Sequence, residues 1–263
     1  MFYRILLIYP AYNIDVSILT AIFLGLIQGL TEFLPVSSSG HLMLFQKLLN
    51  MPNNMLLFNI ILHVATLCAV VIVFRKKIWQ LIRHPLNKTN LYLIIATAIT
   101  CTIVLIFKDL IDRVFTYKVL PVTFMLTAIV LFIVTFVKPR DKNIKMTTAI
   151  TAGLAQGIAV IPGLSRSGIT IAANLALGTK RTEAAEFSFL MSIPIIIASL
   201  VYELISSQEA IKLEVLPTVL AFITALLSGI FAIKFMLHIV ARVKLYWFSI
   251  YLIILALISV FIL

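Results

Sequence analysis

The chain has 263 residues, of which 62% are apolar and only 12% are charged, and its mean hydropathy is +1.13. A soluble domain contains about 25% charged residues. The composition excludes a soluble enzyme, a disordered chain and a disulfide-stapled secreted domain, because a globule of this length cannot hide so much apolar side chain from water. We expect an all-α integral membrane protein whose residues 1–263 form a single membrane domain.

The formal net charge of +11 arises from 21 lysines and arginines against 10 acidic residues. In a soluble chain this excess would suggest nucleic acid as a partner. Here the basic residues lie in short loops between apolar runs, where the positive-inside rule and anionic lipid account for them. We therefore expect membrane lipid, and no nucleic acid, as a partner. Cys68 and Cys101 lie within apolar runs and are expected to be small packed residues rather than a redox pair.

At the N-terminus, residues 1–15 contain no long apolar region followed by a small-residue cleavage site. We expect a short surface lead-in there rather than a signal peptide. Further along the chain, six apolar segments are long enough to cross about 30 Å of hydrocarbon as helices. These segments are residues 55–74, 90–107, 120–137, 185–204, 216–236 and 246–263.

Two further apolar stretches, residues 16–49 and 147–178, are interrupted by polar sequence. The interruptions read PVSSSG at residues 35–40 and PGLSRSG at residues 162–168. Proline removes a backbone donor, and serine and glycine favour turns and helix starts, so each stretch should break into two half-helices. Broken backbone persists at membrane depth only where it is buried in protein or lines a wet cavity. Each stretch therefore predicts a re-entrant helical hairpin.

The two interrupted stretches also resemble each other. When the chain is shifted by 128 residues, seven of the sixteen positions 25–40 are identical, including the match of Gln28 with Gln156. We interpret this as an internal repeat, with residues 16–143 forming repeat 1 and residues 144–263 forming repeat 2. One hairpin and three spans per repeat leave the second copy inverted relative to the first, which predicts an inverted-topology repeat.

The distribution of charge predicts the orientation. If both hairpins re-enter, the loops at residues 75–88, 138–146, 179–184 and 237–245 share one side and hold thirteen lysines and arginines, against six on the other side. The positive-inside rule makes the first side cytoplasmic. Both chain termini and the mouth of the first hairpin then face outward.

The first interruption gathers polar residues that are costly at membrane depth and are therefore functional candidates. Gln28 and Glu32 are four residues apart and share a helical face, although they could simply pair with a neighbouring helix. Ser37-Ser38-Ser39 opens a half-helix whose free N–H groups suit an anion, and His41 follows. Serine and histidine could act as nucleophile and base, or histidine could attack phosphorus itself. Ordinary capping by serine with a packed His41 is the structural alternative.

The second interruption adds Arg166, the one arginine within a predicted apolar segment, at another half-helix start. Its planar guanidinium can hold phosphate oxygens at two places, or it could neutralise Glu32 as a structural ion pair. In an inverted repeat the two broken loops converge, so Glu32, the serines, His41 and Arg166 would share one cavity suited to phosphoryl transfer. His63 lies within a predicted span and is interpreted as structural.

Two segments resemble a known family. Residues 28–41 (QGLTEFLPVSSSGH) resemble the first signature of the undecaprenyl-diphosphate phosphatase family of the bacitracin-resistance type. Residues 162–170 (PGLSRSGIT) resemble its second signature, Pro-Gly-x-Ser-Arg-Ser-x-x-Thr. Gln28 stands where many members carry glutamate, so a second carboxylate for a metal is absent, and Ser39 stands where threonine is common.

The resemblance implies hydrolysis of undecaprenyl diphosphate to undecaprenyl phosphate and inorganic phosphate, which recycles the lipid carrier for cell-wall synthesis. It implies the bacterial cytoplasmic (inner) membrane, an active site facing the outer, periplasmic side, and a divalent cation (Mg²⁺ or Ca²⁺) on Glu32 and Gln28. The expected catalytic residues are Ser38, His41, Glu32 and Arg166. The expected substrate-binding residues are Ser37, Ser39, Ser165, Ser167 and Thr170.

Inverted repeats with re-entrant hairpins are also transporter architecture. A lipid-phosphate flippase or transporter that uses the same cavity is therefore the alternative hypothesis. Transport needs Arg166 but no nucleophile, whereas hydrolysis needs one as well. The spacing favours Ser38 as nucleophile with His41 as base over direct attack by His41, and both stay open. A homodimer is compatible with the sequence, which does not decide the oligomeric state.

Overall fold

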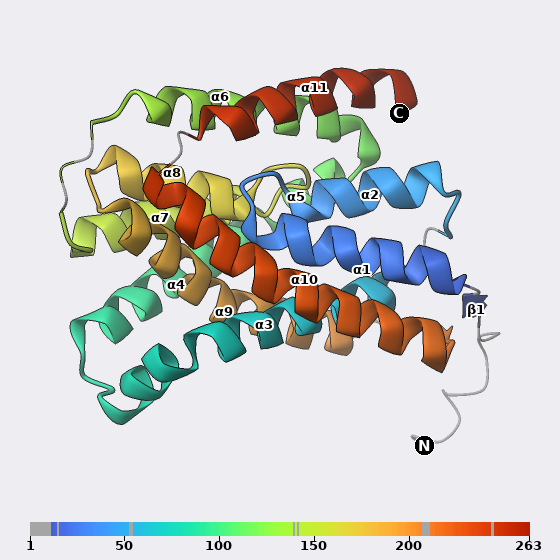
Figure 1. The fold of residues 1–263 in the computed structure, drawn as a ribbon, viewed down its shortest axis with the longest axis horizontal. Helices are drawn as coiled ribbons and strands as arrows, with labels where there is room; N and C mark the ends of the chain where they lie inside the picture. The colour runs from blue at the N-terminus through green and yellow to red at the C-terminus, as the bar shows by residue number, and fades with distance from the viewer. Residues whose placement is uncertain are drawn as a thin grey trace.

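The computed structural model describes residues 12–14, 16–52, 55–138, 140, 142–206, 211–242 and 245–263. In this part of the chain nearly all secondary structure is helical, as expected (Figure 1). The helices are α1 (Ile18–Phe33), α2 (Ser38–Leu48), α3 (Leu56–Arg83), α4 (Lys88–Ile106), α5 (Lys108–Val114), η2 (Tyr117–Val119), α6 (Leu120–Thr135), α7 (Met146–Ile158), α8 (Arg166–Ala176), α9 (Arg181–Ser206), α10 (Val215–Arg242) and α11 (Tyr246–Ile262).

Six of these helices coincide with the six predicted spans, namely α3, α4, α6, α9, α10 and α11. Five of them are long and apolar enough to cross a membrane, and α11 is shorter, with 17 residues. Helix α3 has 28 residues and is kinked at Phe74 (φ −96°, ψ 15°), the last residue of the predicted segment, beyond which it continues through a run of basic residues to Arg83. Lysine and arginine are good helix formers whose heads reach water while their stems cover apolar surface, so the helix outlasts the apolar sequence.

Two short strands were not predicted from the sequence. Strand β1 (Tyr12–Ile14) pairs in parallel with β2 (Ile211–Leu213), so the description as all-α needs this small correction. Pairing across about 200 residues leaves no local pattern, because strand preference depends on the neighbouring strand. Of the predicted lead-in, residues 1–11 and 15 lie outside the described part of the chain.

Both interrupted stretches form broken helix pairs, as predicted. The first breaks between Phe33 and Ser38, and the second breaks between Ile158 and Arg166. Figure 1 shows that the α1–α2 pair runs inward from the end of the molecule that carries β1, and the α7–α8 pair runs inward from the opposite end. The loops of the two pairs meet in the middle of the molecule.

Close packing joins the two loops. A Cβ on Gly40 would lie 2.5 Å from the Phe124 ring and 2.9 Å from Cα of Gly163, so only glycine fits at this crossing. The Ser167 hydroxyl donates a hydrogen bond of 2.9 Å to the carbonyl of Leu34, just beyond the end of α1. The α7–α8 pair thus donates a hydrogen bond to a carbonyl of the α1–α2 pair, and the two pairs approach too closely for a side chain at Gly40.

The packing of the helices is exchanged between the two halves of the chain: helices of the first half lie against helices of the second half. Helix α1 lies along α10, α7 lies along α4, and α6 lies along α11. Two of these three contacts involve a member of a broken pair, α1 or α7, so each broken pair is held by a helix from the other half of the chain.

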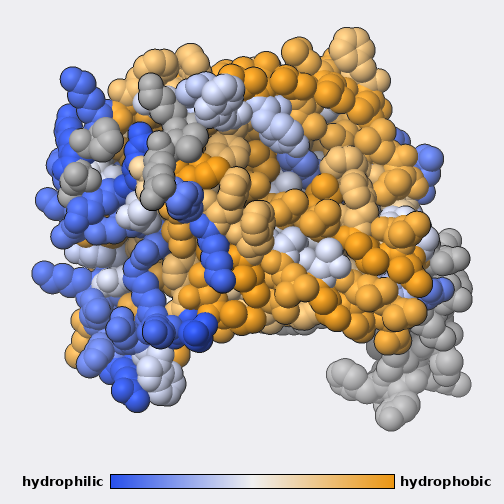
Figure 2. Space-filling view, in the orientation of Figure 1, coloured by the Kyte–Doolittle hydropathy of each residue, from blue (hydrophilic) through white to orange (hydrophobic). Residues whose placement is uncertain are grey.

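The surface divides into an apolar middle and polar ends. Figure 2 shows hydrophilic residues gathered at the end of the molecule where the α3–α4, α6–α7 and α8–α9 loops lie. The middle of the same face is largely hydrophobic, and many large apolar side chains of α4, α6, α10 and α11 are exposed there. A surface of this kind matches a hydrocarbon solvent.

Candidate active site

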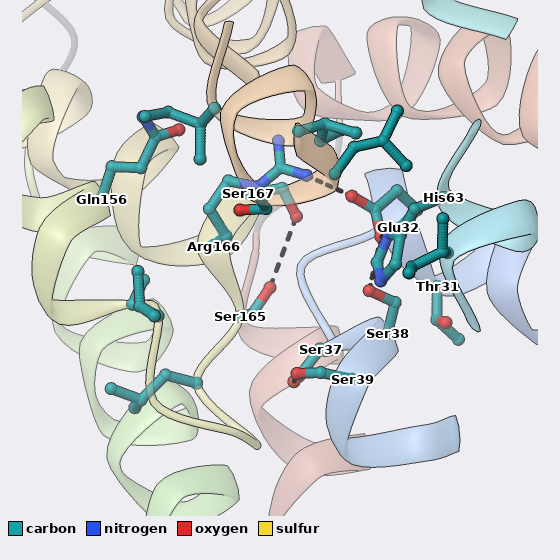
Figure 3. Close-up of a pocket in the computed structure, with 18 of the residues that line it drawn as sticks. Thr31, Glu32, Ser37, Ser38, Ser39, His63, Gln156, Ser165, Arg166 and Ser167 are labelled. Atoms are coloured by element: carbon teal, nitrogen blue, oxygen red, sulfur yellow. Dashed lines mark hydrogen bonds and ion pairs between the residues drawn. The ribbon is translucent and has the colours of Figure 1, made fainter. Parts of the chain in front are cut away.

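A cavity of about 240 Å³ lies where the two loops meet (Figure 3). It is walled by both broken pairs and by α3 and α9. Its polar lining consists of Thr31, Glu32, Ser37, Ser38, Ser39, His63, Gln156, Ser165, Arg166, Ser167 and Ser199. Seven of the residues predicted to form the site are in this list, so the convergence of the two loops is as expected.

Glu32, in the last turn of α1, is the centre of the polar contacts. Its Oε1 forms an ion pair with Nη2 of Arg166, and its Oε2 accepts hydrogen bonds from the Ser38 hydroxyl at 2.5 Å and from Nε2 of Gln28 at 2.9 Å. The Glu32 side chain is 2% exposed. The structure therefore contains the Arg166–Glu32 pair, and it also places a serine hydroxyl directly on the carboxylate.

The ion pair engages only one of the two terminal nitrogens of the Arg166 guanidinium, Nη2. Its Nη1 is buried and has no hydrogen-bond partner among the described residues, and the same holds for Oε1 of Gln156. In Figure 3, Gln156 lies on the far side of Arg166 from Glu32. An unpaired buried donor on a charged group costs free energy, so this arm of the guanidinium is suited to an acceptor that enters the cavity.

Two helix starts open onto the same cavity. Ser37 caps α2 and Ser165 caps α8, each accepting a hydrogen bond from a glycine N–H three residues on, at 3.3 and 3.1 Å. The capping role is thus present for both serines. The first N–H groups of a helix lack partners within it and carry the positive end of its dipole. Two such ends in one cavity favour an anion.

The backbone at Ser37 is strained. Its φ of 71° lies in the left-handed region, which residues other than glycine seldom adopt. Such strain persists where the surrounding structure fixes it, and it is concentrated at functional sites. Here it turns the chain from α1 into α2 sharply enough for the Ser38 hydroxyl to reach back to Glu32.

His41 does not line the cavity, so the expectation that Ser38 and His41 both face it is wrong for His41. Its Nδ1 lies 2.7 Å from the carbonyl oxygen of Ser37 and its Nε2 lies 2.7 Å from the Tyr251 hydroxyl. The ring stacks on Tyr251 and is 1% exposed. The partner on α11 is distant in sequence, which is why helical spacing alone placed this imidazole incorrectly.

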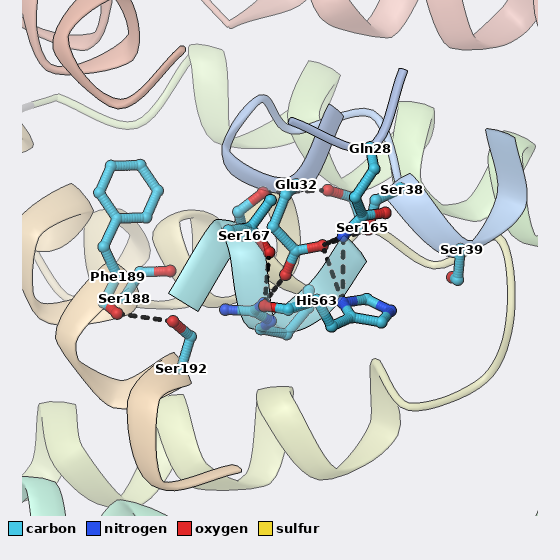
Figure 4. A network of polar contacts seen from close by, with 12 residues as sticks. Gln28, Glu32, Ser38, Ser39, His63, Ser165, Ser167, Ser188, Phe189 and Ser192 are labelled. Atoms are coloured by element: carbon cyan, nitrogen blue, oxygen red, sulfur yellow. Dashed lines mark hydrogen bonds and ion pairs between the residues drawn. The ribbon is translucent and has the colours of Figure 1, made fainter. Parts of the chain in front are cut away.

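Thr170 also lies outside the cavity. Its hydroxyl is buried and lies 2.7 Å from the carbonyl oxygen of Arg166 and 2.6 Å from the Ser188 hydroxyl on α9. Figure 4 shows Ser188 on α9, close to the polar contacts around Glu32. In this structure Thr170 holds the first turn of α8 against α9 rather than facing a ligand.

Four polar residues of the lining were not predicted from the sequence, namely Thr31, His63, Gln156 and Ser199, and His63 is the one that contacts Glu32. Its Nδ1 lies 3.0 Å from Nε2 of Gln28 and 3.6 Å from Oε2 of Glu32, and its side chain is 35% exposed towards the cavity (Figure 4). An imidazole in the middle of a predicted span is by itself a functional candidate. Applying that rule to His63 as it was applied to Glu32 would have identified it.

The predicted metal ligands do not form a cation site in this structure. Among the described residues there is no group of three or more histidine, cysteine, aspartate or glutamate side chains that could hold a metal ion. Both oxygens of Glu32 are already engaged, and Gln28 turns its Nε2, rather than its oxygen, towards the carboxylate. Because Mg²⁺ and Ca²⁺ need several oxygen ligands, Glu32 and Gln28 do not suffice.

The fold and the cavity define a class of protein: a multi-pass helical membrane protein with a polar cavity between two broken helix pairs. The sequence profile of the family described as bacitracin resistance protein BacA matches residues 21–258. The chain belongs to this family, which confirms the resemblance carried by the two signatures.

Full-length relatives agree with this assignment. The chain is 43% identical over 239 residues to an undecaprenyl-diphosphatase of Carboxydothermus hydrogenoformans, covering 88% of this chain and 92% of the relative. It is 40% identical over 254 residues to an undecaprenyl-diphosphatase of Treponema denticola, covering 90% and 94%. It is 37% identical over 250 residues to one of Christiangramia forsetii, covering 89% and 94%.

Proposed function

We propose that the protein is a membrane-embedded phosphatase that hydrolyses undecaprenyl diphosphate to undecaprenyl phosphate and inorganic phosphate. The family and its relatives named undecaprenyl-diphosphatase support this activity. The observation that assigns this activity to particular residues is the arrangement of the cavity. In it, the Ser38 hydroxyl donates a hydrogen bond to Glu32, while Nη1 of Arg166 has no partner among the described residues. A nucleophile, its base and an anion holder are the parts that phosphoryl transfer requires.

In the first step, the terminal phosphate occupies the cavity between Arg166 and the starts of α2 and α8. The Ser38 hydroxyl passes its proton to Glu32 while its oxygen attacks the terminal phosphorus. The bond from phosphorus to the bridging oxygen breaks, and undecaprenyl phosphate leaves with the bonding electron pair. Arg166 and the helix N–H groups stabilise the charge that develops on the phosphoryl oxygens.

In the second step, water hydrolyses the phosphoserine. Glu32 first releases the proton that it took from Ser38 to the departing undecaprenyl phosphate or to water. It then accepts a proton from the water molecule that attacks the phosphoserine. The oxygen of Ser38 leaves phosphorus and regains a proton from Glu32, so that one water molecule is consumed and one inorganic phosphate is released. In this scheme Glu32 replaces His41 as the base, and His41 positions α2 through Tyr251.

Within the membrane, we propose six spans and two re-entrant pairs arranged as an inverted repeat of residues 16–143 and 144–263. The exchanged packing of α1 with α10 and of α7 with α4 supports this division. The hydrophilic end of the molecule (Figure 2), whose loops are rich in lysine and arginine, would face the cytoplasm, and the α1–α2 pair would open towards the outer face of the bacterial inner membrane.

Two expectations stay predictions within this proposal. A divalent cation, Mg²⁺ or Ca²⁺, would arrive bound to the diphosphate, where it needs few ligands from the protein. A homodimer is compatible with the arrangement but nothing in the single chain requires one. The transporter hypothesis needs an anion holder alone, so the contact between Ser38 and Glu32 favours hydrolysis.

The test is phosphate release from undecaprenyl diphosphate by detergent-purified protein and its Arg166→Lys variant. Lysine keeps the charge but cannot reach both Glu32 and the phosphate with a planar fork. We expect the rate to fall roughly 10²-fold or more, with wild-type melting temperature. A folded Lys variant with near-normal turnover would instead assign Arg166 to a purely structural ion pair.

A further inference from the structure

A second cavity adjoins the one lined by Ser38, Glu32 and Arg166, which we call the phosphate site. It has a volume of about 330 Å³ and lies between α4, α5 and α9; we call it the α4–α9 groove. Its walls are mainly apolar and include Cys101, Val104 and Leu105 of α4 and Ala198 of α9. The volume is within the range of small-molecule sites, about 300–1,000 Å³.

The groove and the phosphate site share part of their walls. Phe115, Val160, Ile195 and Ser199 line both cavities. On the phosphate side the lining is rich in hydroxyl, carboxylate and guanidinium groups. The groove is lined mainly by apolar side chains, and its charged members are Lys108 and Asp112 of α5. A single molecule with an anionic head and a hydrocarbon tail matches this change of polarity.

The groove is open along its length. Leu105 is 73% exposed and Phe115 is 55% exposed, so the described part of the chain leaves these side chains uncovered. A hydrocarbon chain leaving the groove would therefore enter the lipid phase directly. The first carbons of the chain would be held by protein and the remainder would lie in the membrane.

We infer that the α4–α9 groove binds the first isoprene units of the prenyl diphosphate, adjacent to the diphosphate head. This inference rests on the proposed function, because it takes the head to occupy the cavity of Ser38 and Arg166. Apolar contacts in the groove then select a prenyl chain over a free diphosphate. Substrate recognition is thereby divided between a polar site for the head and an apolar site for the tail.

Cys101 provides a direct probe, with Cys68 as an internal control. Both thiols are half-buried in α4 and α3, and Cys101 alone of the two lines the groove. We expect farnesyl diphosphate to slow the labelling of Cys101 by N-ethylmaleimide at least severalfold, while the labelling of Cys68 is unchanged. Inorganic diphosphate should protect neither thiol, since it fills only the head site.

Phosphate release from farnesyl diphosphate is measured in parallel. Release without protection of Cys101 would overturn the groove assignment and leave the activity intact, whereas no release of phosphate would overturn the proposed function. If protection of Cys101 depends on the protein concentration and not on farnesyl diphosphate, the groove is instead a contact between two copies of the chain, and the assignment is wrong.

A matched pair of substitutions gives a second readout. Val104→Trp fills the groove, and Val122→Trp makes the same change at an exposed position of α6. We expect Val104→Trp to raise KM for undecaprenyl and farnesyl diphosphates roughly tenfold or more, and to raise KM for dimethylallyl diphosphate much less, because its single isoprene unit contacts only the start of the groove. Val122→Trp should change none of these. An equal loss with all three substrates, or no loss with any, would contradict the assignment.

Discussion

Glu32 combines two functions that the sequence suggested separately. Its carboxylate pairs with Arg166 through one oxygen and accepts a hydrogen bond from the Ser38 hydroxyl through the other. The pair keeps Glu32 charged where burial would favour its neutral form, and a charged carboxylate can act as a base. The structural ion pair and the proposed catalytic contact therefore share one carboxylate through different oxygens, and they are not competing interpretations.

The occupied oxygens of Glu32 also lead to a prediction about metal. Detergent-purified protein without substrate should bind no stoichiometric Mg²⁺ or Ca²⁺, because the carboxylate is already satisfied by Arg166, Gln28 and Ser38. Isothermal titration calorimetry with each cation checks this. One tightly bound ion per chain that disappears in Glu32→Gln would show that Glu32 is a metal ligand after all.

At the scale of the elements, local sequence predicted the helices and their breaks but not which side chains meet. Apolar length defines a span, and proline, serine and glycine break one, so both broken pairs were identifiable. The orientation of His41 depends on Tyr251, which is 210 residues away. The β1–β2 pairing and the place of His63 beside Glu32 likewise depend on contacts between distant segments.

The crossing of the two loops gives a prediction for the broken pairs. Gly40→Ala would drive a methyl group into the Phe124 ring and the backbone of Gly163. We expect a loss of about 1–3 kcal/mol of stability from overpacking, seen as a lower melting temperature, together with lower activity because Ser38 is in the same helical turn. Phe124→Leu in the same chain should recover part of the stability. Independent, additive effects of the two substitutions would show that the crossing is not as close as described.

At the scale of the whole molecule, the exchanged packing and the charged end suggest an orientation in the membrane. A reporter that is active only in the cytoplasm should be active when fused near residue 142 and inactive at residue 263, because thirteen lysines and arginines lie on the side of residue 142 against six on the other. The reverse pattern would place the mouth of the α1–α2 pair in the cytoplasm and would contradict an outward-facing site.

The central claim is that Ser38 attacks the terminal phosphorus within the cavity formed by the two loops. Rapid acid quenching with undecaprenyl diphosphate labelled at its terminal phosphate tests it most directly. We predict acid-stable label on Ser38, no label and a rate reduced roughly 10³-fold or more in Ser38→Ala. In Ser39→Ala, whose lost hydroxyl lines the same cavity, we predict a much smaller loss of rate with the label retained. Label that is lost in acid but kept in base, as on histidine, or an active Ser38→Ala protein, would contradict the account.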